Sequence, residues 1–368
     1  MPYLPIEDVK PGSYLGHTIF SESGSVLLNK GVELSDSFIR KLHMRGYKSL
    51  YVQESPEDEV EMQDVVSPQV RNKAVMSLRE TFTTVSKHGH SRKKWQESTK
   101  KLDDLSWEIL EDLENQSSLK ADLINLKCVN EYTLEHSVNV GIMSGYLGME
   151  SGLNMKQVRE IIKSGIYHDI GKTFVKNDIL EKPASLTEDE MEEIRKHPKT
   201  GFRMLMNQYN MSPMISIGSH LHHERWDGSG YPNGMAGEEI HIYGRIVSII
   251  DVFDAMTSDR VYHRAQGNDV VLAHIESLSG TEFDPMLVDI LSAIIYPYPT
   301  GTKVALSNRT TAIVVTNHPK TPQMPTVKVV KPETQAGLIY ELAQHQDEIE
   351  ITTALHSSLP ESAGEIHG

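Results

Sequence analysis

Residues 222–232 read HHERWDGSGYP and place two adjacent histidines directly before a glycine-rich loop. Two neighbouring imidazoles suggest a metal site, and other segments of the chain carry further residues of ligand type. The complete set of candidate metal ligands is His136, His168, Asp169, His197, His222, His223 and Asp251. These histidines and aspartates provide enough nitrogen and oxygen donors for two divalent ions. Such a pair of ions is best suited to the hydrolysis of a phosphoester.

The number of donors predicts an open, catalytic centre. A single histidine on a helix is more often structural than a metal ligand, so the prediction depends on the whole set. His168 and Asp169 are adjacent on a predicted helix, which suits a carboxylate that bridges two ions beside an imidazole that binds one of them. With Asp169 bridging, the set supplies about eight of the roughly twelve bonds of two octahedral ions. The remaining positions accept water and phosphate oxygens, and a water between two cations becomes hydroxide near neutral pH.

Two cationic side chains near these ligands are candidates for substrate contacts. Lys172 follows Asp169 by three residues and can stabilise charge on phosphorus or on the departing oxygen, so we expect these two residues to carry the catalysis. An exposed surface lysine is the alternative. Arg260 can form a bidentate contact with a phosphate or a guanine edge, and an ion pair with Asp254 or Asp259 is an equally good interpretation.

The loop after the two histidines has glycines at positions 228, 230, 234 and 237. This density lets the backbone approach a ligand closely, although it also describes any tight surface loop. Tyr231 and Trp226 carry rings that can stack on a nucleobase, while packing of the loop against neighbouring helices is the default expectation.

Composition limits the partners and the setting of the chain. The 368 residues have a formal net charge of −15, which argues against binding to a nucleic-acid polymer through its phosphates. The single cysteine, Cys128, cannot form an internal disulfide, and the N-terminus shows no secretion signal, so we expect a cytoplasmic setting. No apolar run reaches the roughly 20 residues that a membrane-spanning helix needs, so direct membrane insertion is not expected.

The sequence pattern predicts a mainly α protein with small β-rich parts at both ends. Helical spacing dominates residues 117–300, with a capping box from Thr187 to Glu190 and Pro285 in a first helical turn. The other predicted parts are a small β-rich module with one helix at 1–54, an acidic linker and helical connector at 55–116, a small β appendix at 301–344 and a mobile tail at 345–368. The helical connector is a candidate for pairing two copies of the chain.

Taken together and in this order, HDIGK, HHERWDGSGYP and DVFDAMTSDR resemble the HD-GYP family, a branch of the HD phosphohydrolases, over roughly residues 117–300. The resemblance implies an HD-type helical bundle, a centre of iron or manganese, and cyclic di-GMP as the substrate, hydrolysed to pGpG and onward to GMP. It places the seven candidate ligands on ligand positions, and Lys172 and Arg260 on substrate-contacting positions. The segment 230–232 matches the signature loop, which in the family is also linked to contacts with diguanylate cyclase domains.

Two positions depart from the family pattern. Members with a third metal have a glutamate one helical turn before the first ligand, where this chain has Tyr132, so we expect two metals. Many members have a second cationic side chain where this chain has His263, so we expect a weaker or differently shaped grip on substrate. Two alternatives therefore stay open: a binding module that responds to cyclic dinucleotides with little catalysis, and a phosphodiesterase for another cyclic dinucleotide.

Overall fold

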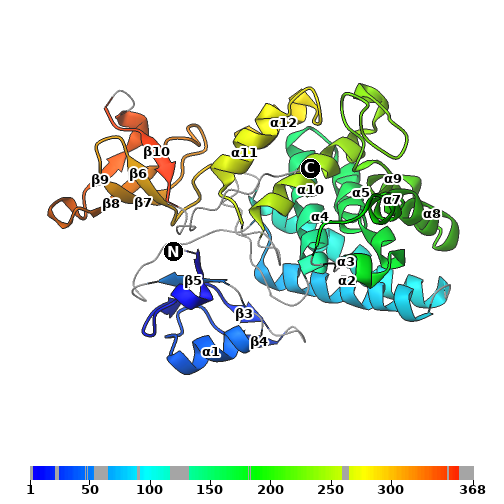
Figure 1. Cartoon of the computed structure of the whole chain (residues 1–368), viewed down its shortest axis with the longest axis horizontal. Coiled ribbons are helices and arrows are strands. Elements are labelled where there is room, and N and C mark those ends of the chain that lie inside the picture. The colour runs from blue at the N-terminus through cyan, green and yellow to red at the C-terminus, as the bar shows by residue number, and fades with distance from the viewer. Residues whose placement is uncertain are drawn as a thin grey trace. The chain divides into compact units, whose positions relative to one another are not determined.

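The computed structural model describes residues 3–20, 25–45, 47, 49–53, 65–88, 92–116, 132–180, 182, 184–258, 265–345 and 348–355. The chain divides into two compact units. The first comprises Met1–His17, Lys30–Glu61 and Tyr298–Gly368, and the second comprises Thr18–Asn29 and Met62–Pro297. The small sheets belong mostly to the first unit and all the long helices to the second (Figure 1). The predicted fold class, mainly α with small β parts at both ends, is confirmed.

The N-terminal part of the first unit is a three-stranded antiparallel sheet with one helix. Its strand order is β1 (Tyr3–Pro5), β5 (Ser49–Gln53) and β2 (Tyr14–Leu15). The 3₁₀ turn η1 (Ile6–Asp8) follows β1, and the helix is α1 (Asp36–Met44). The Ser35 side chain caps α1 by accepting the amide hydrogen of Phe38. A separate hairpin of β3 (Ile19–Phe20) and β4 (Val26–Leu28) lies in the second unit.

The C-terminal sheet has five antiparallel strands in the order β10-β6-β7-β8-β9. Every second residue along the central strands is buried, which gives the sheet one apolar face. Its strands and 3₁₀ turns are β6 (Lys303–Leu306), β7 (Thr311–Thr316), β8 (Thr326–Lys331), η5 (Glu333–Gln335), β9 (Ile339–Glu341), η6 (Leu342–Gln344) and β10 (Ile351–Ala354).

The strand β10 falls within the segment 345–368 that we expected to be a mobile tail. Here the structure differs, because residues 351–354 pair with β6 as an edge strand and Ala354 is buried. Residues 356–368 lie outside the described part of the chain, so the expectation for them stays a prediction, as do the other predicted domain boundaries.

The second unit is a helical bundle. Its elements are α2 (Pro68–His88), α3 (Arg92–Gln116), α4 (Tyr132–Glu150), α5 (Met155–Ile166), η2 (Ile170–Phe174), α6 (Asn177–Leu180), α7 (Glu188–Arg195), α8 (His197–Arg203), η3 (Met204–Gln208), α9 (Pro213–Leu221), η4 (Gly237–Glu239), α10 (Ile242–Thr257), α11 (Asn268–Ser277) and α12 (Pro285–Ile294). The capping box of Thr187 and Glu190 opens α7, and Pro285 lies in the first turn of α12, as the sequence predicts. Within the described residues, no helix combines the length and the apolar composition that crossing a bilayer requires.

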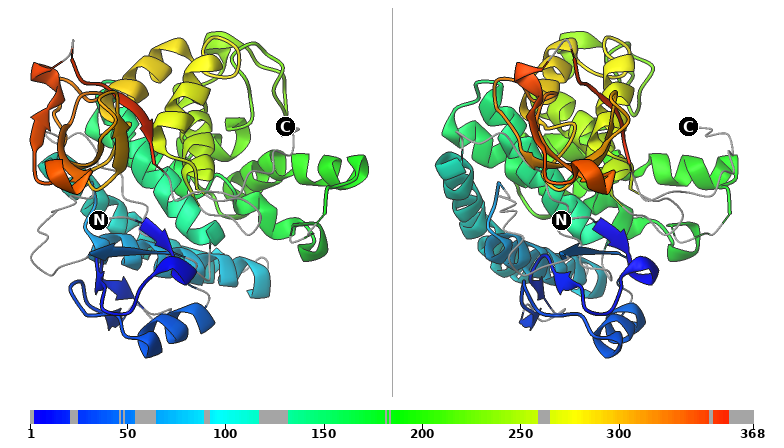
Figure 2. Two further views of the ribbon diagram at one scale, coloured as in Figure 1. Left: turned by 60° about the vertical axis from the view of Figure 1, so that its left-hand side comes forward. Right: turned by 90° about the vertical axis from the view of Figure 1, so that its left-hand side faces the viewer.

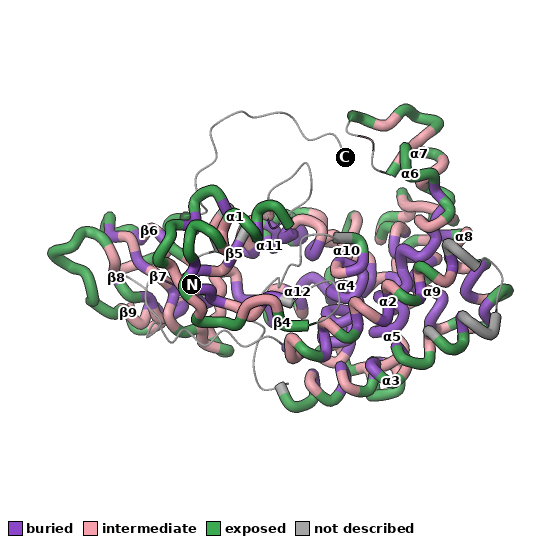
Figure 3. Tube along the Cα trace, turned by 90° about the horizontal axis from the view of Figure 1, so that it is seen from below, coloured by how far each residue is buried: buried purple, intermediate pink, exposed green. Residues whose placement is uncertain are grey.

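The centre of the bundle is formed by α4, α5 and α10, whose buried residues dominate this region in Figure 3. Two glycines let α4 and α5 approach each other very closely. A Cβ atom on Gly141 would lie 2.7 Å from the carbonyl oxygen of Ile162, and one on Gly165 would lie 2.8 Å from the Cα of Gly141. Since real side chains do not tolerate such distances, only glycine permits this crossing. The crossing brings the start of α4, which carries His136, near the end of α5.

The helices α2 and α3 lie side by side and pack into the same core (Figure 2). Leu78 of α2 and Leu102 and Ile109 of α3 are buried in one hydrophobic cluster with residues of α4, α5 and α10. The ring of Trp95 on α3 stacks on Tyr209 with their centroids 3.8 Å apart. The segment that we expected to be a connector therefore contributes directly to the bundle core.

An ion-pair cluster joins α3 to α5. The carboxylate of Asp103 lies 2.6 Å from Arg159 Nη2 and 2.6 Å from Lys163 Nζ. Partial burial raises the pKa of Asp103, but hydrogen bonds and positive charges from Lys163 and Arg159 outweigh it and lower this pKa below its ordinary value. The Lys163 side chain is only 10% exposed, so its ammonium depends on this carboxylate.

We expect Asp103→Asn to lower the free energy of unfolding by about 1–2 kcal/mol at pH 7, because a largely buried ammonium loses its anion. A carboxyl with a lowered folded-state pKa stabilises the fold above its unfolded pKa, and this contribution is lost as pH falls below about 4. Urea unfolding at pH 7 and at pH 3.5 measures the difference, which should shrink at the lower pH. The exposed neighbour Asp104, changed to Asn, is the matched control. Equal stabilities of the two variants at pH 7 would contradict the prediction.

Candidate metal centre

His168 and Asp169 lie at a break between two helices. We expected both on one helix, and this is wrong: α5 ends at Ile166, and Asp169 is the residue that precedes the 3₁₀ helix η2. The break follows from the packing of η2 on α8, where a Cβ on Gly171 would lie 2.9 Å from the carbonyl carbon of His197 and 2.8 Å from the amide nitrogen of Gly201. The chain must leave the axis of α5 to reach this position, and doing so brings Asp169 to His197 at the start of α8.

Three of the histidines are held in the same way by backbone carbonyl groups. The Nδ1 atoms of His168, His197 and His222 donate to the carbonyl oxygens of Gly165, Ile194 and Gly218, at 2.7, 2.7 and 2.9 Å. A carbonyl oxygen can only accept, so each Nδ1 carries a hydrogen, and Nε2 is the ring nitrogen that is left to face the site. This orientation by a backbone partner is typical of histidines that bind metal ions.

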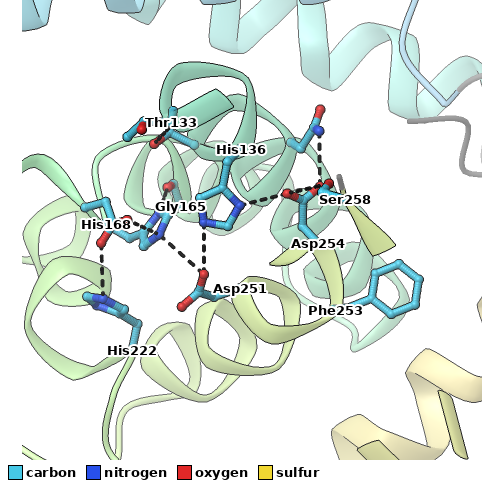
Figure 4. Close-up of polar contacts among 12 residues, drawn as sticks. Thr133, His136, Gly165, His168, His222, Asp251, Phe253, Asp254 and Ser258 are labelled. Carbon is cyan, nitrogen blue, oxygen red and sulfur yellow. Dashed lines mark hydrogen bonds and ion pairs between the residues drawn. The ribbon is translucent and has the colours of Figure 1, made fainter. Parts of the chain in front are cut away.

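Ring nitrogens of the five histidines converge with the two carboxylates in overlapping groups. His136, His168 and Asp251 form one group, and His197, His222 and His223 form another. A third group, His168, Asp169 and His222, shares one residue with each of them, and within every group the candidate ligand atoms lie within 4.8 Å of one another. In the first group Asp251 Oδ1 lies 3.0 Å from His136 Nε2 and 3.7 Å from His168 Nε2 (Figure 4). All seven sequence-predicted ligands are thus brought together.

The carboxylate of Asp169 lies between the two groups. Its Oδ2 is 3.5 Å from His168 Nε2, while its Oδ1 is 3.3 Å from His197 Nε2 and 3.7 Å from His222 Nε2. The two oxygens of one carboxylate therefore face different sets of imidazoles. This is the arrangement that a carboxylate bridging two ions requires.

The donor set fits divalent metal ions. Among the described residues, His168 Nε2 and Asp169 Oδ1 are buried atoms without a hydrogen-bond partner, and such atoms are costly unless something satisfies them. Ligand atoms about 2.1 Å from a shared octahedral ion lie about 3 Å apart, close to the shortest separations found here. A cation between these atoms would satisfy both orphaned groups.

The ionisation of three candidate ligands matches what metal binding requires. Burial raises the pKa of Asp169, but the charges of Lys172 and His168 outweigh it and hold this pKa well below the ordinary range. Burial lowers the pKa of His222 well below its usual value and the pKa of His223 to about 3. The carboxylate is therefore ionised and both imidazoles are neutral, which are the forms that coordinate metals.

His136 differs because it lies between two carboxylates. Burial lowers its pKa, but hydrogen bonds to Asp251 and Asp254 outweigh burial and raise the pKa of His136 to about 9. Without a metal ion the ring thus holds a proton on Nε2, 3.0 Å from Asp251. A divalent ion bound by His136 and Asp251 would replace that proton.

Asp254 is a site residue that sequence reasoning missed, since we considered it only as an ion-pair partner for Arg260. It is buried, and its Oδ2 accepts a hydrogen bond from His136 Nδ1 at 2.7 Å (Figure 4). Its three-residue spacing from Asp251 on α10 was the available signal, because residues three apart share one side of a helix. Asp254 does for His136 what backbone carbonyl groups do for the other histidines.

The glycine-rich loop is held by a second missed residue, Glu224. This buried carboxylate accepts the amide hydrogens of Asn233 and Met235, at 2.8 and 3.0 Å. Gly230 packs so closely that its Cβ would lie 2.6 Å from the Cα of Glu224. The loop shape places the Tyr231 ring on His223, with centroids 4.7 Å apart and an interplanar angle of 21°. One face of the predicted nucleobase-stacking ring is therefore occupied by a candidate ligand.

The remaining predicted contact residues have different outcomes. Lys172 Nζ lies 2.6 Å from Asp169 Oδ2, since residues three apart are eclipsed in a 3₁₀ helix. Trp226 packs in the loop, where the guanidinium of Arg245 lies 5.6 Å from its ring centroid. Arg260 and His263 lie outside the described residues, so their predicted substrate contacts stay predictions.

Residues 118–287 match the family model of the HD domain. The chain is 30% identical over 336 residues to the cyclic di-GMP phosphodiesterase PA4108 of Pseudomonas aeruginosa, covering 86% of this chain and 80% of that protein. It is 41% identical over 152 residues to the cyclic di-GMP phosphodiesterase response regulator RpfG of Xanthomonas campestris pv. campestris, covering 40% of each chain. The solved structure of Bd1817, a HDG"Y"P protein from Bdellovibrio bacteriovorus, matches with a TM-score of 0.51 and 12% identity, covering 80% of this chain and 98% of that one. At that identity the likeness shows the fold alone.

A helical bundle with converging histidines and aspartates, together with the HD-domain match, defines the class of metal-dependent HD phosphohydrolases. The similarity to PA4108 extends over most of both chains. The chain belongs to the HD-GYP family.

Proposed function

We propose that this chain is a phosphodiesterase that hydrolyses cyclic di-GMP to pGpG and onward to GMP. The observation that carries the proposal is the carboxylate of Asp169, whose two oxygens face two separate groups of candidate ligands. The names of the relatives PA4108 and RpfG support the choice of substrate.

The seven converging residues are proposed to hold two divalent ions, with iron or manganese as the metal. His136, His168 and Asp251 would hold one ion, His197, His222 and His223 the other, and Asp169 would contact both. When bound, two such ions supply Lewis acidity toward phosphate oxygens and lower the pKa of a bound water. Family members with a third metal have a glutamate where this chain has Tyr132, which supports two metal ions per chain.

The side chains of this protein are proposed to bind and orient the substrate around that centre. Lys172 places an ammonium next to Asp169, where it can stabilise negative charge on the phosphate or on the departing oxygen. Arg260 is proposed to bind a phosphate or a guanine edge, with His263 and the other face of the Tyr231 ring as further substrate contacts.

We expect Lys172→Met to lower kcat about 100-fold with a smaller change in KM, because the ammonium acts mainly on charge that develops during the reaction. Steady-state kinetics of the metal-loaded protein measure both constants. Lys176→Met removes an exposed lysine four residues away and is the control. A kcat of Lys172→Met equal to that of the control would contradict the catalytic role.

The test of the proposed function uses the full chain loaded anaerobically with iron or with manganese. Elemental analysis should give about two ions per chain, and chromatography should show cyclic di-GMP converted to pGpG and then GMP. A hybrid cyclic GMP-AMP substrate is assayed in parallel, and faster turnover of the hybrid would reassign the substrate. Tight binding of cyclic di-GMP by calorimetry, without turnover under any metal, would identify a binding module and overturn the proposed enzyme.

The proposed setting and partners follow from the same assignment. The protein is proposed to act in the cytoplasm, because its single cysteine, Cys128, cannot form an internal disulfide. The segment 230–232 is the proposed contact for a diguanylate cyclase domain, and the pair α2 and α3 is the proposed contact between two copies of the chain. Nucleic-acid polymers are not proposed as partners, because the net charge of −15 opposes phosphate binding.

A further inference from the structure

A row of buried, hydrogen-bonded polar side chains connects α2 to the candidate metal centre. Arg71 Nη1 on α2 donates a hydrogen bond to Asn139 Oδ1 on α4, and Asn139 Nδ2 donates to Asp254 Oδ1 on α10 at 3.1 Å. Asp254 Oδ2 then accepts from His136 Nδ1 at 2.7 Å. Three helices thus contribute to the orientation of one candidate metal ligand.

All four hydrogen-bonded side chains are buried, so the loss of any one hydrogen bond would leave a polar group unsatisfied in the protein interior. Asp254 is 1% exposed, Asn139 6% and Arg71 9%. A buried carboxylate is strongly unfavourable unless its oxygens are hydrogen-bonded. Ser258 Oγ also donates to Asp254 but lies 3.4 Å away, so the shorter side-chain contacts of Asp254 are with His136 and Asn139.

Arg71 determines which way the amide of Asn139 faces. A guanidinium only donates hydrogen bonds, so it must meet the amide oxygen of Asn139. The amide nitrogen is then directed at Asp254, where it donates. An inverted amide would place its oxygen against the carboxylate, and two acceptors would repel each other in a medium of low dielectric constant. Arg71 therefore helps to orient Asp254 through Asn139.

We propose that Arg71 and Asn139 are positioning residues for the metal ligand His136, and that through them the position of α2 controls how tightly the ion at His136 and Asp251 is bound. The inference rests on the metal centre of the proposed function. Asp254 accepts the hydrogen on His136 Nδ1 and so directs Nε2 at the metal site. Along the chain α2 is the first described helix after the N-terminal sheet, so a displacement of α2 would reach the metal centre by this route.

The test measures metal affinity of the full chain by competition with a chelator, using manganese as the probe. Arg71→Met should weaken one of the two bound ions about 10-fold, and Asn139→Leu should weaken it about 10- to 100-fold, as is typical when a partner of a metal ligand is removed. The double variant should be no weaker than Asn139→Leu, because both changes break the same route. Lys73→Met on α2 removes only an exposed ion pair with Glu108 and should leave both affinities unchanged.

Further measurements separate positioning from a structural role. Arg71→Lys keeps a donor at this position and should restore part of the lost affinity. The absorption spectrum of cobalt bound in place of manganese should change in Arg71→Met and not in Lys73→Met. Unchanged affinities in Arg71→Met, a loss of melting temperature without a loss of affinity, or additive effects in the double variant would each overturn the inference. If Arg71→Met does not fold, Arg71→Lys and Asn139→Leu decide the question. Wild-type protein that binds no divalent ion would overturn the proposed function itself, and the inference with it.

Discussion

Asp169→Asn is expected to lower the rate of cyclic di-GMP hydrolysis about a thousandfold and to reduce the bound metal below two ions per chain. The amide keeps the shape of the carboxylate but loses its charge, and it offers one ligand oxygen where Asp169 presents two, toward His168 and toward His197. A loss of about 4 kcal/mol of metal-dependent stabilisation corresponds to this factor. Single-turnover kinetics and elemental analysis measure the two effects on the same preparation.

Asp178→Asn is the matched control for this change. Asp178 is an exposed aspartate on α6, nine positions along the chain, and the same substitution there should leave turnover and metal content unchanged. Full activity in Asp169→Asn with two bound ions would mean that the carboxylate does not join the two ligand groups. The proposed centre would then have to be rebuilt around separate ions.

Gly171→Ala is expected to have the second largest effect, although it removes no functional group. The new methyl group would lie 2.8 Å from the amide nitrogen of Gly201 and 2.9 Å from the carbonyl carbon of His197, so α8 or η2 must shift. Such overpacking costs about 1–3 kcal/mol of stability. A displacement of about 1 Å between His197 and Asp169 should also lower activity about 100-fold.

Gly148→Ala provides the comparison for the added methyl group. Gly148 lies on α4, and its nearest neighbour would be the flexible end of Leu153, 3.0 Å away, so the helix can accept the methyl group. Thermal unfolding and metal affinity should change in Gly171→Ala and stay near wild type in Gly148→Ala. Equal melting temperatures and equal activities in both variants would show that the close packing of η2 on α8 does not position the site.

The identity of the candidate ligands was predictable from the sequence, but several features of their surroundings were not. Histidine and aspartate are recognisable metal-ligand types in the sequence, and the seven candidate ligands do converge in the structure. The helix break at His168 and Asp169 was missed, because no local pattern in IYHDIGK indicates it. It results from the contact of Gly171 with α8, whose residues lie about 26 positions along the chain. Asp254 and Glu224 were missed because their partners, His136 and the backbone of Asn233 and Met235, become neighbours only after folding.

By itself the sequence determined the helical class and the capping box that opens α7, since both depend on residues that are adjacent or one helical turn apart. Its composition gave the net charge and the chemical types of the candidate ligands. Only the tertiary structure decided which oxygen of Asp169 faces which imidazole, which ring nitrogen carries a hydrogen, and that Arg71 is linked to His136. These features depend on close packing between segments far apart in the chain. Glycines at the crossing of α4 and α5 permit that packing, and no local sequence pattern specifies how closely the two helices approach.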